Sequence, residues 1–344
     1  MDFFDIIKEG TGEGFADSLF KVQDSDGKLL TLRGEVTTQI ARMLASRARD
    51  ETRLFYITNC VKYIDSDASG QREYWQAGAE LIGGDAASSD AEVIALALSI
   101  LDSIGLKAAQ IDVGSVGLFR YVLDYFGISD FEGVIRAVKR KSVDDLRGIS
   151  MNPRALEMFT YMISRRGGIE VIDKLSEMAD GDLGGQKGYF RKLFRLLDAY
   201  GCAGRVKIDL GTLREMKYYN GIIFEIFLGG IGTPLGGGGR YDAMMKEFGL
   251  EESRATGFAI SVDTCIRALE SCNFSFNSKE KPLGIFFLEG YEEAAIALAN
   301  RLRAGGKGCY VSAYNGEREG VLVSEGVLDL STGKEMQLGG MGGR

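Results

Sequence analysis

The chain has 344 residues, of which 45% are hydrophobic and 26% are charged, and its formal net charge is −8. This length and composition are typical of a globular protein with two or three domains and a sizeable core. The acidic balance argues against a general nucleic-acid binder, which normally presents a basic face. No stretch approaches the ~18 consecutive apolar residues of a membrane-spanning helix, so no membrane partner is expected.

Histidine is absent from the chain, and its five cysteines are scattered without a CxxC pair. A chain without histidine has no Ser-His-Asp or Cys-His catalysis, no histidine-ligated metal and no histidine general base. The cysteine spacing indicates neither a zinc site nor a disulfide framework. The first residues lack a basic region followed by an apolar run, so no signal peptide is indicated. We therefore expect a cytoplasmic protein with reduced thiols and with neither metal nor cofactor.

The first part of the chain predicts antiparallel strands. Two β-prone runs within residues 19–33 are joined by a Ser-Asp-Gly turn and predict a hairpin. A helix follows with an apolar stripe at helical spacing, and Thr37 or Thr38 is expected to cap it. Residues 53–62 predict another strand.

The next strand, within residues 72–84, organises the rest of the chain. Alternation places Tyr74, Gln76, Gly78, Glu80 and Ile82 on one face, and Trp75, Ala77, Ala79 and Leu81 on the other. The second face is expected to be buried in a core. The first face has a carboxamide and a carboxylate on either side of a glycine gap, which suits a small ligand with an ammonium or imidazolium group. Considered alone, the strand is equally compatible with an ordinary half-exposed strand.

The middle of the chain predicts helices. Ser89 and Glu92 form a capping box before a helix that ends near residue 104. A short strand at 108–113 precedes four or five helical segments between about 118 and 200, which we interpret as an insertion with a polar surface.

Strand patterns then return at 205–210, 218–227 and 257–262. Between them, the string GGGGRYD (residues 236–242) either lets the backbone approach a ligand or allows a crowded turn. We expect one domain over residues 1–272, a polar linker at 273–281, and a small C-terminal α/β domain over 282–344 with a disordered tail.

Four strings in this order carry a resemblance: QAGAELIGGD, DAEVIAL, YYNGIIFE and GGGGRYD. The chain resembles the histidyl-tRNA synthetase family, and more narrowly the regulatory subunits of ATP phosphoribosyltransferase, which are synthetase-like paralogues acting in histidine biosynthesis. The resemblance covers about residues 15–270 well and the tail loosely. It implies an α+β fold, with a class II aminoacyl-tRNA synthetase-like antiparallel sheet flanked by helices, a helical insertion and a small C-terminal α/β unit. The family's motif 1, which builds its homodimer interface, precedes the matched part, so dimer formation is left open.

The resemblance also implies a histidine pocket. The string LRGEVT matches the family's LRPEGT-like string, with Gly34 where proline is usual, and Lys217 stands where an aspartate is usual. In the family, the glutamate and threonine of this string hold the α-amino group, a tyrosine pair closes on the imidazole and an arginine contacts the carboxylate. The histidine-binding residues implied for this chain are Glu35, Thr37, Gln76, Glu80, Arg214, Tyr218 and Tyr219.

The nucleotide half matches the family less well. Class II synthetases hold ATP with two arginines, whose planar, permanently charged groups suit a triphosphate. Lys62 and Thr264 stand at these two positions here. Loss of a charge-assisted contact weakens transition-state stabilisation, so the resemblance implies a degraded ATP site and no catalytic residue.

We therefore hypothesise a non-catalytic regulatory subunit. It would form a hetero-oligomer with the short catalytic subunit of ATP phosphoribosyltransferase and would sense histidine for feedback inhibition. The alternatives are an active histidyl-tRNA synthetase and a histidine-binding scaffold for another partner. The C-terminal unit is short for an anticodon-binding domain, which argues against tRNA as a partner.

Overall fold

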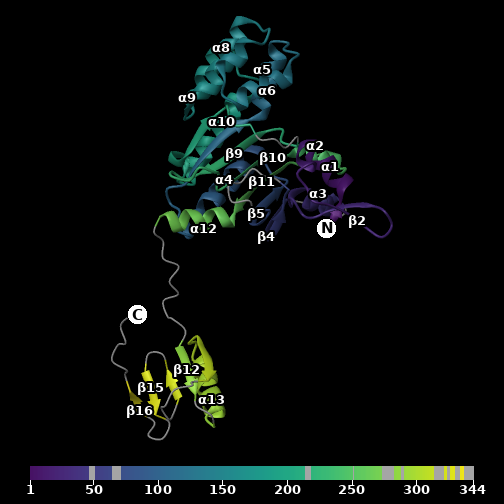
Figure 1. Ribbon diagram of the computed structural model, residues 1–344. Helices are drawn as coiled ribbons and strands as arrows, with labels where there is room; N and C mark the ends of the chain where they lie inside the picture. Colours follow the sequence, from purple (N-terminus) through teal and green to yellow (C-terminus); the bar gives the residue numbers. More distant parts are fainter. Residues whose placement is uncertain are drawn as a thin grey trace. The chain divides into compact units, whose positions relative to one another are not determined.

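The computed structural model describes residues 1–45, 51–63, 71–213, 218–250, 252–272, 283–287 and 290–313, together with the backbone of three strands between residues 321 and 336. By their contacts the residues divide into two units, Met1–Asn273 and Phe274–Arg344 (Figure 1). Within the described residues, no helix is both long and apolar enough to cross a membrane.

The first unit begins with a small layer of sheet and helix. Strands β1 (Asp2–Phe3), β3 (Leu29–Thr31) and β2 (Lys21–Gln23) form an antiparallel sheet in this order, which confirms the predicted hairpin. Helices α1 (Phe4–Thr11) and α2 (Glu13–Ala16) precede the hairpin and were not predicted. Helix α3 (Thr37–Ala45) follows it.

The main sheet has eight strands in the order β4-β5-β11-β10-β9-β6-β8-β7, and every neighbouring pair is antiparallel except β6 and β8. This is the antiparallel sheet that the sequence predicted. The bounds of its strands are β4 Thr52–Val61, β5 Glu73–Ile82, β6 Gln110–Ser115, β7 Arg166–Gly167, β8 Val206–Asp209, β9 Ile222–Phe227, β10 Gly236–Arg240 and β11 Ala255–Ser261.

One face of this sheet carries the principal core. Leu81, Phe224 and Phe258 belong to one hydrophobic cluster with buried side chains of α4 (Ala86–Ser103), α10 (Gln186–Ala199) and α12 (Val262–Ser271). The prediction for the second face of β5 holds at Leu81 and is wrong at Trp75, which is 50% exposed. The core therefore ends before the first half of β5.

The helical insertion is present over nearly the expected range, from Val116 to Ala199. It contains α5 (Val116–Tyr125), α6 (Phe131–Lys139), α7 (Val143–Arg147), α8 (Pro153–Ser164) and α9 (Glu170–Met178), and it leads into α10 (Figure 1). Four of these helices begin where a polar side chain accepts a backbone N–H, as expected of N-caps; the residues are Ser115, Asp130, Ser142 and Asn152.

The predicted capping box at Ser89 and Glu92 is wrong. Helix α4 begins one turn earlier, at Ala86, and the carboxylate of Asp85 accepts the backbone N–H of Ser88. Glu92 instead forms two hydrogen bonds with Arg53 of β4, at 2.6 and 2.8 Å. Asp85 supplies the acceptor for a backbone N–H at the start of the helix, so Ser89 lies inside the helix.

A buried ion pair joins the sheet to the helices that cover it. Arg240, at the end of β10, donates from Nε to Asp90 of α4 at 3.0 Å and from Nη2 to the carbonyl of Ala86 at 2.8 Å. Tyr189 of α10 donates its hydroxyl to the same carboxylate. Since buried charges require partners, this network holds β10, α4 and α10 in fixed positions.

The second unit contains β12 (Leu283–Phe287), α13 (Glu292–Ala304), β13 (Cys309–Ala313), β14 (Val321–Val323), β15 (Gly326–Asp329) and β16 (Lys334–Met336). Its sheet order is β13-β12-β14-β15-β16. Its small core contains Ile285 of β12 and Ala295 and Ala299 of α13.

Candidate functional site

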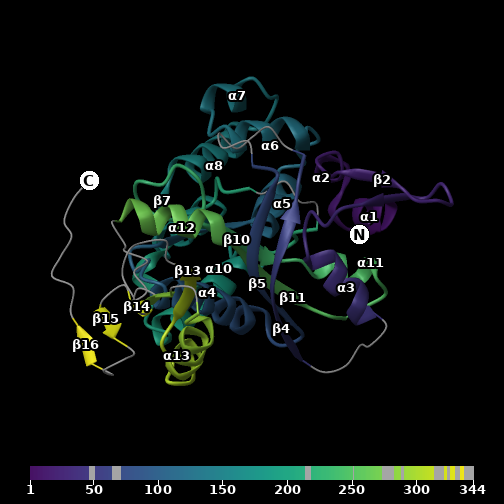
Figure 2. The ribbon, with the colours of Figure 1, turned by 60° about the horizontal axis from the view of Figure 1, so that its bottom comes forward.

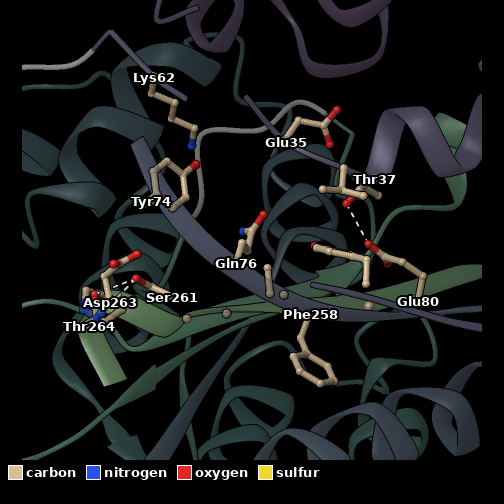
Figure 3. A pocket seen from close by; sticks show the side chains of 18 of the residues that line it. Glu35, Thr37, Lys62, Tyr74, Gln76, Glu80, Phe258, Ser261, Asp263 and Thr264 are labelled. Carbon is tan, nitrogen blue, oxygen red and sulfur yellow. Dashed lines mark hydrogen bonds between the residues drawn. The ribbon is translucent and has the colours of Figure 1, made fainter. Parts of the chain in front are cut away.

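A pocket of about 390 Å³ lies on the face of the main sheet opposite the principal core (Figure 3). The structure brings together here six of the seven residues that the resemblance implied for histidine binding: Glu35, Thr37, Gln76, Glu80, Tyr218 and Tyr219. Arg214 and Lys217 lie outside the described residues.

Glycines form the floor of the pocket. Gly78 of β5 and Gly257 of β11 have no room for a side chain, since a Cβ at Gly257 would lie 1.7 Å from Oε2 of Glu80 and one at Gly78 would lie 2.4 Å from the ring of Tyr56. The run Gly236–Arg240 forms strand β10 and not a crowded turn, and its glycines 236–238 also line the pocket. The ring of Tyr56 therefore fills the space beside Gly78 that the sequence of β5 suggested as a gap, and the glycines that line the pocket are Gly236, Gly237, Gly238 and Gly257.

Glu80 is the central polar group at the inner end. Its side chain is buried, with the residue 3% exposed, and its carboxylate accepts hydrogen bonds from the hydroxyls of Thr37 at 2.8 Å and Tyr241 at 2.7 Å. The pKa of Glu80 is raised to about 7, because burial and the charge of Glu35 raise it by more than these two hydrogen bonds lower it. The carboxylate is therefore held in place, and no positively charged side chain among the described residues forms an ion pair with it.

Glu35 is the second buried carboxylate of the pocket. Its oxygens accept the backbone N–H of Thr38 at 3.0 and 3.2 Å, so Glu35 caps α3. Burial raises the pKa of Glu35, and the hydrogen bonds from Thr38 and the charge of Lys62 oppose this. Within the described part of the chain, neither Glu35 nor Glu80 forms an ion pair.

The predicted threonine cap of α3 is wrong. Thr37 directs its hydroxyl to Glu80, and the hydroxyl of Thr38 is buried without a hydrogen-bond partner in the described structure. The start of α3 instead fixes both the Glu35 carboxylate and the hydroxyl that holds Glu80. The residues at the start of α3 therefore both cap the helix and form part of the pocket.

Aromatic side chains line the same end of the pocket. The rings of Tyr218 and Tyr219 have centroids 4.6 Å apart, and the ring of Tyr218 lies edge-on to Tyr241 at 6.0 Å. The carboxamide oxygen of Gln76 accepts from the thiol of Cys60 at 3.4 Å. Aromatic faces beside two buried carboxylates favour a small, flat cation.

Sequence reasoning assigned no role to Tyr241, although it lies in the GGGGRYD string. The signal for its role is the sheet order, because β11 pairs with both β5 and β10 and so brings Glu80 near the end of β10. The order of the strands in the sheet cannot be deduced from the sequence of one strand.

The other end of the pocket holds Lys62 and Thr264, the two residues at which the resemblance predicts a degraded ATP site. Lys62 Nζ lies 4.5 Å from the ring centroid of Phe15 and 5.7 Å from that of Tyr74. Thr264 donates its hydroxyl and its backbone N–H to Ser261 Oγ, at 2.9 and 3.2 Å. Figure 3 shows Lys62, Thr264 and Asp263 on one side of Gln76, and Glu35, Thr37 and Glu80 on the other.

Arg267 is a pocket residue that sequence reasoning missed. It lies one turn after Thr264 on α12 and donates to the Thr264 hydroxyl at 3.2 Å. Among the described lining residues, Arg267 therefore brings a guanidinium group to this half of the pocket, three residues after Thr264. The carboxylate of Asp263 lies beside it and accepts the backbone N–H of Trp75 at 2.6 Å. The described residues contain no cluster of three or more Asp, Glu or Cys side chains that could hold a metal ion.

Comparison with known proteins places this site in a family. A family model for histidyl-tRNA synthetase matches residues 1–265, so the match begins at the first residue and not near residue 15. An ATP phosphoribosyltransferase regulatory subunit of Thermoanaerobacter pseudethanolicus is 32% identical over 310 residues, which cover 88% of this chain and 81% of that protein. A histidine–tRNA ligase of Thermococcus kodakarensis is 34% identical over 291 residues, covering 78% and 65%.

A solved structure from Bacillus halodurans, described as an ATP phosphoribosyltransferase regulatory subunit/histidyl-tRNA synthetase, superposes with a TM-score of 0.76 at 29% identity. It covers 88% of this chain, and this chain covers 79% of it, which confirms the predicted class II synthetase-like fold. The chain belongs to the histidyl-tRNA synthetase family and, within it, to the group of ATP phosphoribosyltransferase regulatory subunits.

Proposed function

We propose that this chain is the non-catalytic regulatory subunit of an ATP phosphoribosyltransferase and that it binds histidine in the pocket over β5 and β11. One observation carries the proposal: the pocket is asymmetric. Its inner end holds two buried carboxylates between aromatic side chains, whereas its outer end has Lys62 and Thr264 at the two positions where synthetases have arginines. The names of the relatives at about 30% identity supply the pathway and the partner.

Histidine supplies a positive charge, which the described residues at the inner end do not provide. Its α-ammonium group and its imidazole are both hydrogen-bond donors, and Glu35, Glu80 and Gln76 are the acceptors that line the cavity. A buried carboxylate without a positive partner is costly, and a bound cation removes that cost. The tyrosine rings provide a flat surface for the imidazole.

Binding by itself does not regulate. Histidine controls the complex only if it binds more tightly to one of two conformational states, and it can shift the equilibrium between them by no more than that difference in affinity. The proposed partner is the short catalytic subunit, which condenses ATP with phosphoribosyl pyrophosphate. In a hetero-oligomer of the two chains, histidine as the pathway's end product would favour the inhibited state.

An active histidyl-tRNA synthetase is the second candidate. Its support is the 34% identity to a histidine–tRNA ligase and the position of Arg267, which returns a guanidinium group to the outer end of the pocket. The two functions share the histidine pocket, so only the use of ATP separates them.

The histidine site predicts a specific loss of affinity. Glu80→Gln removes a charge-assisted hydrogen bond and is expected to weaken histidine binding by about 1.5–3 kcal/mol. Isothermal titration calorimetry measures this, with Glu92→Gln as the control, because Glu92 bonds Arg53 outside the pocket. Equal affinity of Glu80→Gln and the wild type would show that the site is misplaced.

The raised pKa of Glu80 predicts a pH dependence. Its folded value of about 7 lies above the usual range, so the acid is protonated at pH 6 and must release a proton to pair with a cation. Between pH 6 and 7.5 the ionised fraction of such a group rises roughly eightfold, and histidine affinity is expected to rise with it. Calorimetry in buffers of different ionisation enthalpy measures the released proton. Affinity that falls over this range, or an unchanged profile in Glu80→Gln, would contradict the role of this carboxylate.

The absence of ATP activation is tested separately. The purified chain is expected to show no histidine-dependent exchange of pyrophosphate with ATP, because the planar contacts that hold the triphosphate are replaced at two positions. A histidyl-tRNA synthetase assayed under the same conditions is the positive control. Clear turnover would establish the second candidate and reject the first.

A further inference from the structure

The carboxylate of a bound amino acid needs a partner of its own in the pocket. Glu35, Glu80 and Gln76 are acceptors for the ammonium group and the imidazole of histidine, and two of them are negatively charged. A third negative charge beside them requires a positive group close by. Among the described lining residues, the positively charged side chains are Lys62 and Arg267.

The backbone fixes Lys62 beside the segment that carries Glu35. Lys62 directly follows β4 and donates its backbone N–H to the carbonyl of Arg72 at 2.9 Å. The preceding residue, Val61, donates its N–H at 2.7 Å to the carbonyl of Arg33, two residues before Glu35. Figure 2 shows the N-terminal layer, with α1, α2 and β2, beside β4. Lys62 and Glu35 therefore lie on segments that are joined by a direct hydrogen bond.

Two aromatic rings contact the ammonium group of Lys62. Its Nζ lies 4.5 Å from the ring centroid of Phe15 on α2 and 5.7 Å from that of Tyr74 on β5. Tyr74 also donates its hydroxyl at 3.3 Å to the carbonyl of Gly34, the residue before Glu35. Ring faces attract an ammonium group but do not neutralise its charge. Burial raises the pKa of Glu35, and the charge of Lys62 is one of the influences that lower it, so this charge acts across the pocket.

Arg267 is less suited to bind the carboxylate of the ligand. It is an exposed residue, and its guanidinium group donates to the hydroxyl of Thr264 at 3.2 Å. Figure 3 shows Thr264 and Asp263 at the lower left of the pocket, whereas Lys62 and Glu35 lie along its upper side. A carboxylate placed at the lower left would also meet the negative charge of Asp263. Lys62 is therefore the better placed of the two described cations.

The charges of Lys62 and Glu35 match those of an α-amino acid, which carries an ammonium group and a carboxylate on one carbon. In Figure 3 the two side chains lie above Gln76, one on each side of it, so they present opposite charges to the space between them. A zwitterion placed there meets an opposite charge at each of its charged groups. A ligand with an ammonium group but no carboxylate is attracted by Glu35 and repelled by Lys62.

We propose, on the basis of the histidine pocket proposed above, that Lys62 binds the α-carboxylate of the ligand and determines the specificity of the pocket for a free amino acid. Lys62 then has a function of its own at the position where the resemblance indicates a degraded ATP site. Amines that carry the imidazole but no carboxylate are weak ligands, although the acceptors at the inner end are equally available to them.

Isothermal titration calorimetry with L-histidine and L-histidinol tests this role. L-Histidinol has a hydroxymethyl group in place of the carboxylate and keeps the ammonium group and the imidazole. The wild type is expected to bind histidine roughly 10- to 100-fold more tightly than histidinol, the range for one charge-assisted hydrogen bond. Lys62→Met removes the charge at a similar side-chain length and should abolish most of this preference. Its affinity for histidine should fall, and its affinity for histidinol should stay the same or rise, because the repulsion of the ligand's ammonium group is removed.

Two further variants separate Lys62 from other cations. Lys21→Met is the matched control, because Lys21 Nζ lies 4.6 Å from the ring centroid of Phe4 in the same N-terminal layer but is not among the residues that line the pocket. It should leave both affinities unchanged. Arg267→Met shows whether the other described cation of the pocket carries the preference. Retained binding of histidinol by Lys62→Met also shows that this variant is folded.

Several outcomes would overturn the role of Lys62. They are equal affinity of the wild type for both ligands, a preference for histidine that persists in Lys62→Met, and a preference that is lost only in Arg267→Met or in Arg214→Met, whose position lies outside the described residues. If Lys62→Met binds neither ligand, Lys62→Gln is the second neutral variant, and loss of both ligands there too would show that Lys62 shapes the pocket and does not select the carboxylate. A wild type that binds neither ligand would instead reject the histidine pocket itself.

Discussion

Two buried carboxylates above a floor of glycines are the constraint on which this molecule depends. Glu35 and Glu80 lie in the same cavity without an ion pair in the described structure, and backbone and hydroxyl donors from α3 and from Tyr241, which follows β10, hold them there. Burial of such groups raises the pKa of both and costs stability that a bound cation restores. The start of α3, the glycines of β10 and β11 and the position of Tyr241 all serve this arrangement.

The two ends of the pocket differ in the way that the proposed separation of histidine binding from catalysis requires. The inner end needs only acceptors and aromatic surface, which α3, β5 and the Tyr218–Tyr219 pair provide. The outer end would have to hold a triphosphate, yet Lys62 lies over aromatic rings and Arg267 is bonded to Thr264. The ammonium group of Lys62 and the guanidinium group of Arg267 do not reproduce the planar, bidentate contacts that two arginines make with a triphosphate. Strand β4 borders the pocket on one face and solvent on the other. Tyr56 lines the pocket, whereas its sequence neighbours Phe55 and Ile57 are exposed.

Local pattern predicted most strands and the position of the pocket, because alternation in β5 depends only on neighbouring residues. The resemblance supplied Glu35 and the two tyrosines, whose roles require the whole fold. Tyr241 was missed because its partner lies on a strand two positions away in the sheet, and Arg267 because it is an exposed residue that reaches the pocket from α12, one turn after Thr264. The predicted caps at Thr37 and Ser89 are wrong because the carboxylates of Glu35 and Asp85 accept the backbone N–H groups at the starts of these helices. Helices α1 and α2 carried no pattern that we identified.

The central claim is that this chain regulates a partner through a histidine pocket and performs no chemistry itself. Reconstitution tests it most directly: the rate at which a short-form catalytic subunit condenses ATP with phosphoribosyl pyrophosphate is measured alone, with this chain, and with this chain plus histidine. The account predicts activity that requires the chain and that histidine inhibits, with inhibition weakened when the chain carries Glu80→Gln. A rate that is the same with and without the chain would contradict it.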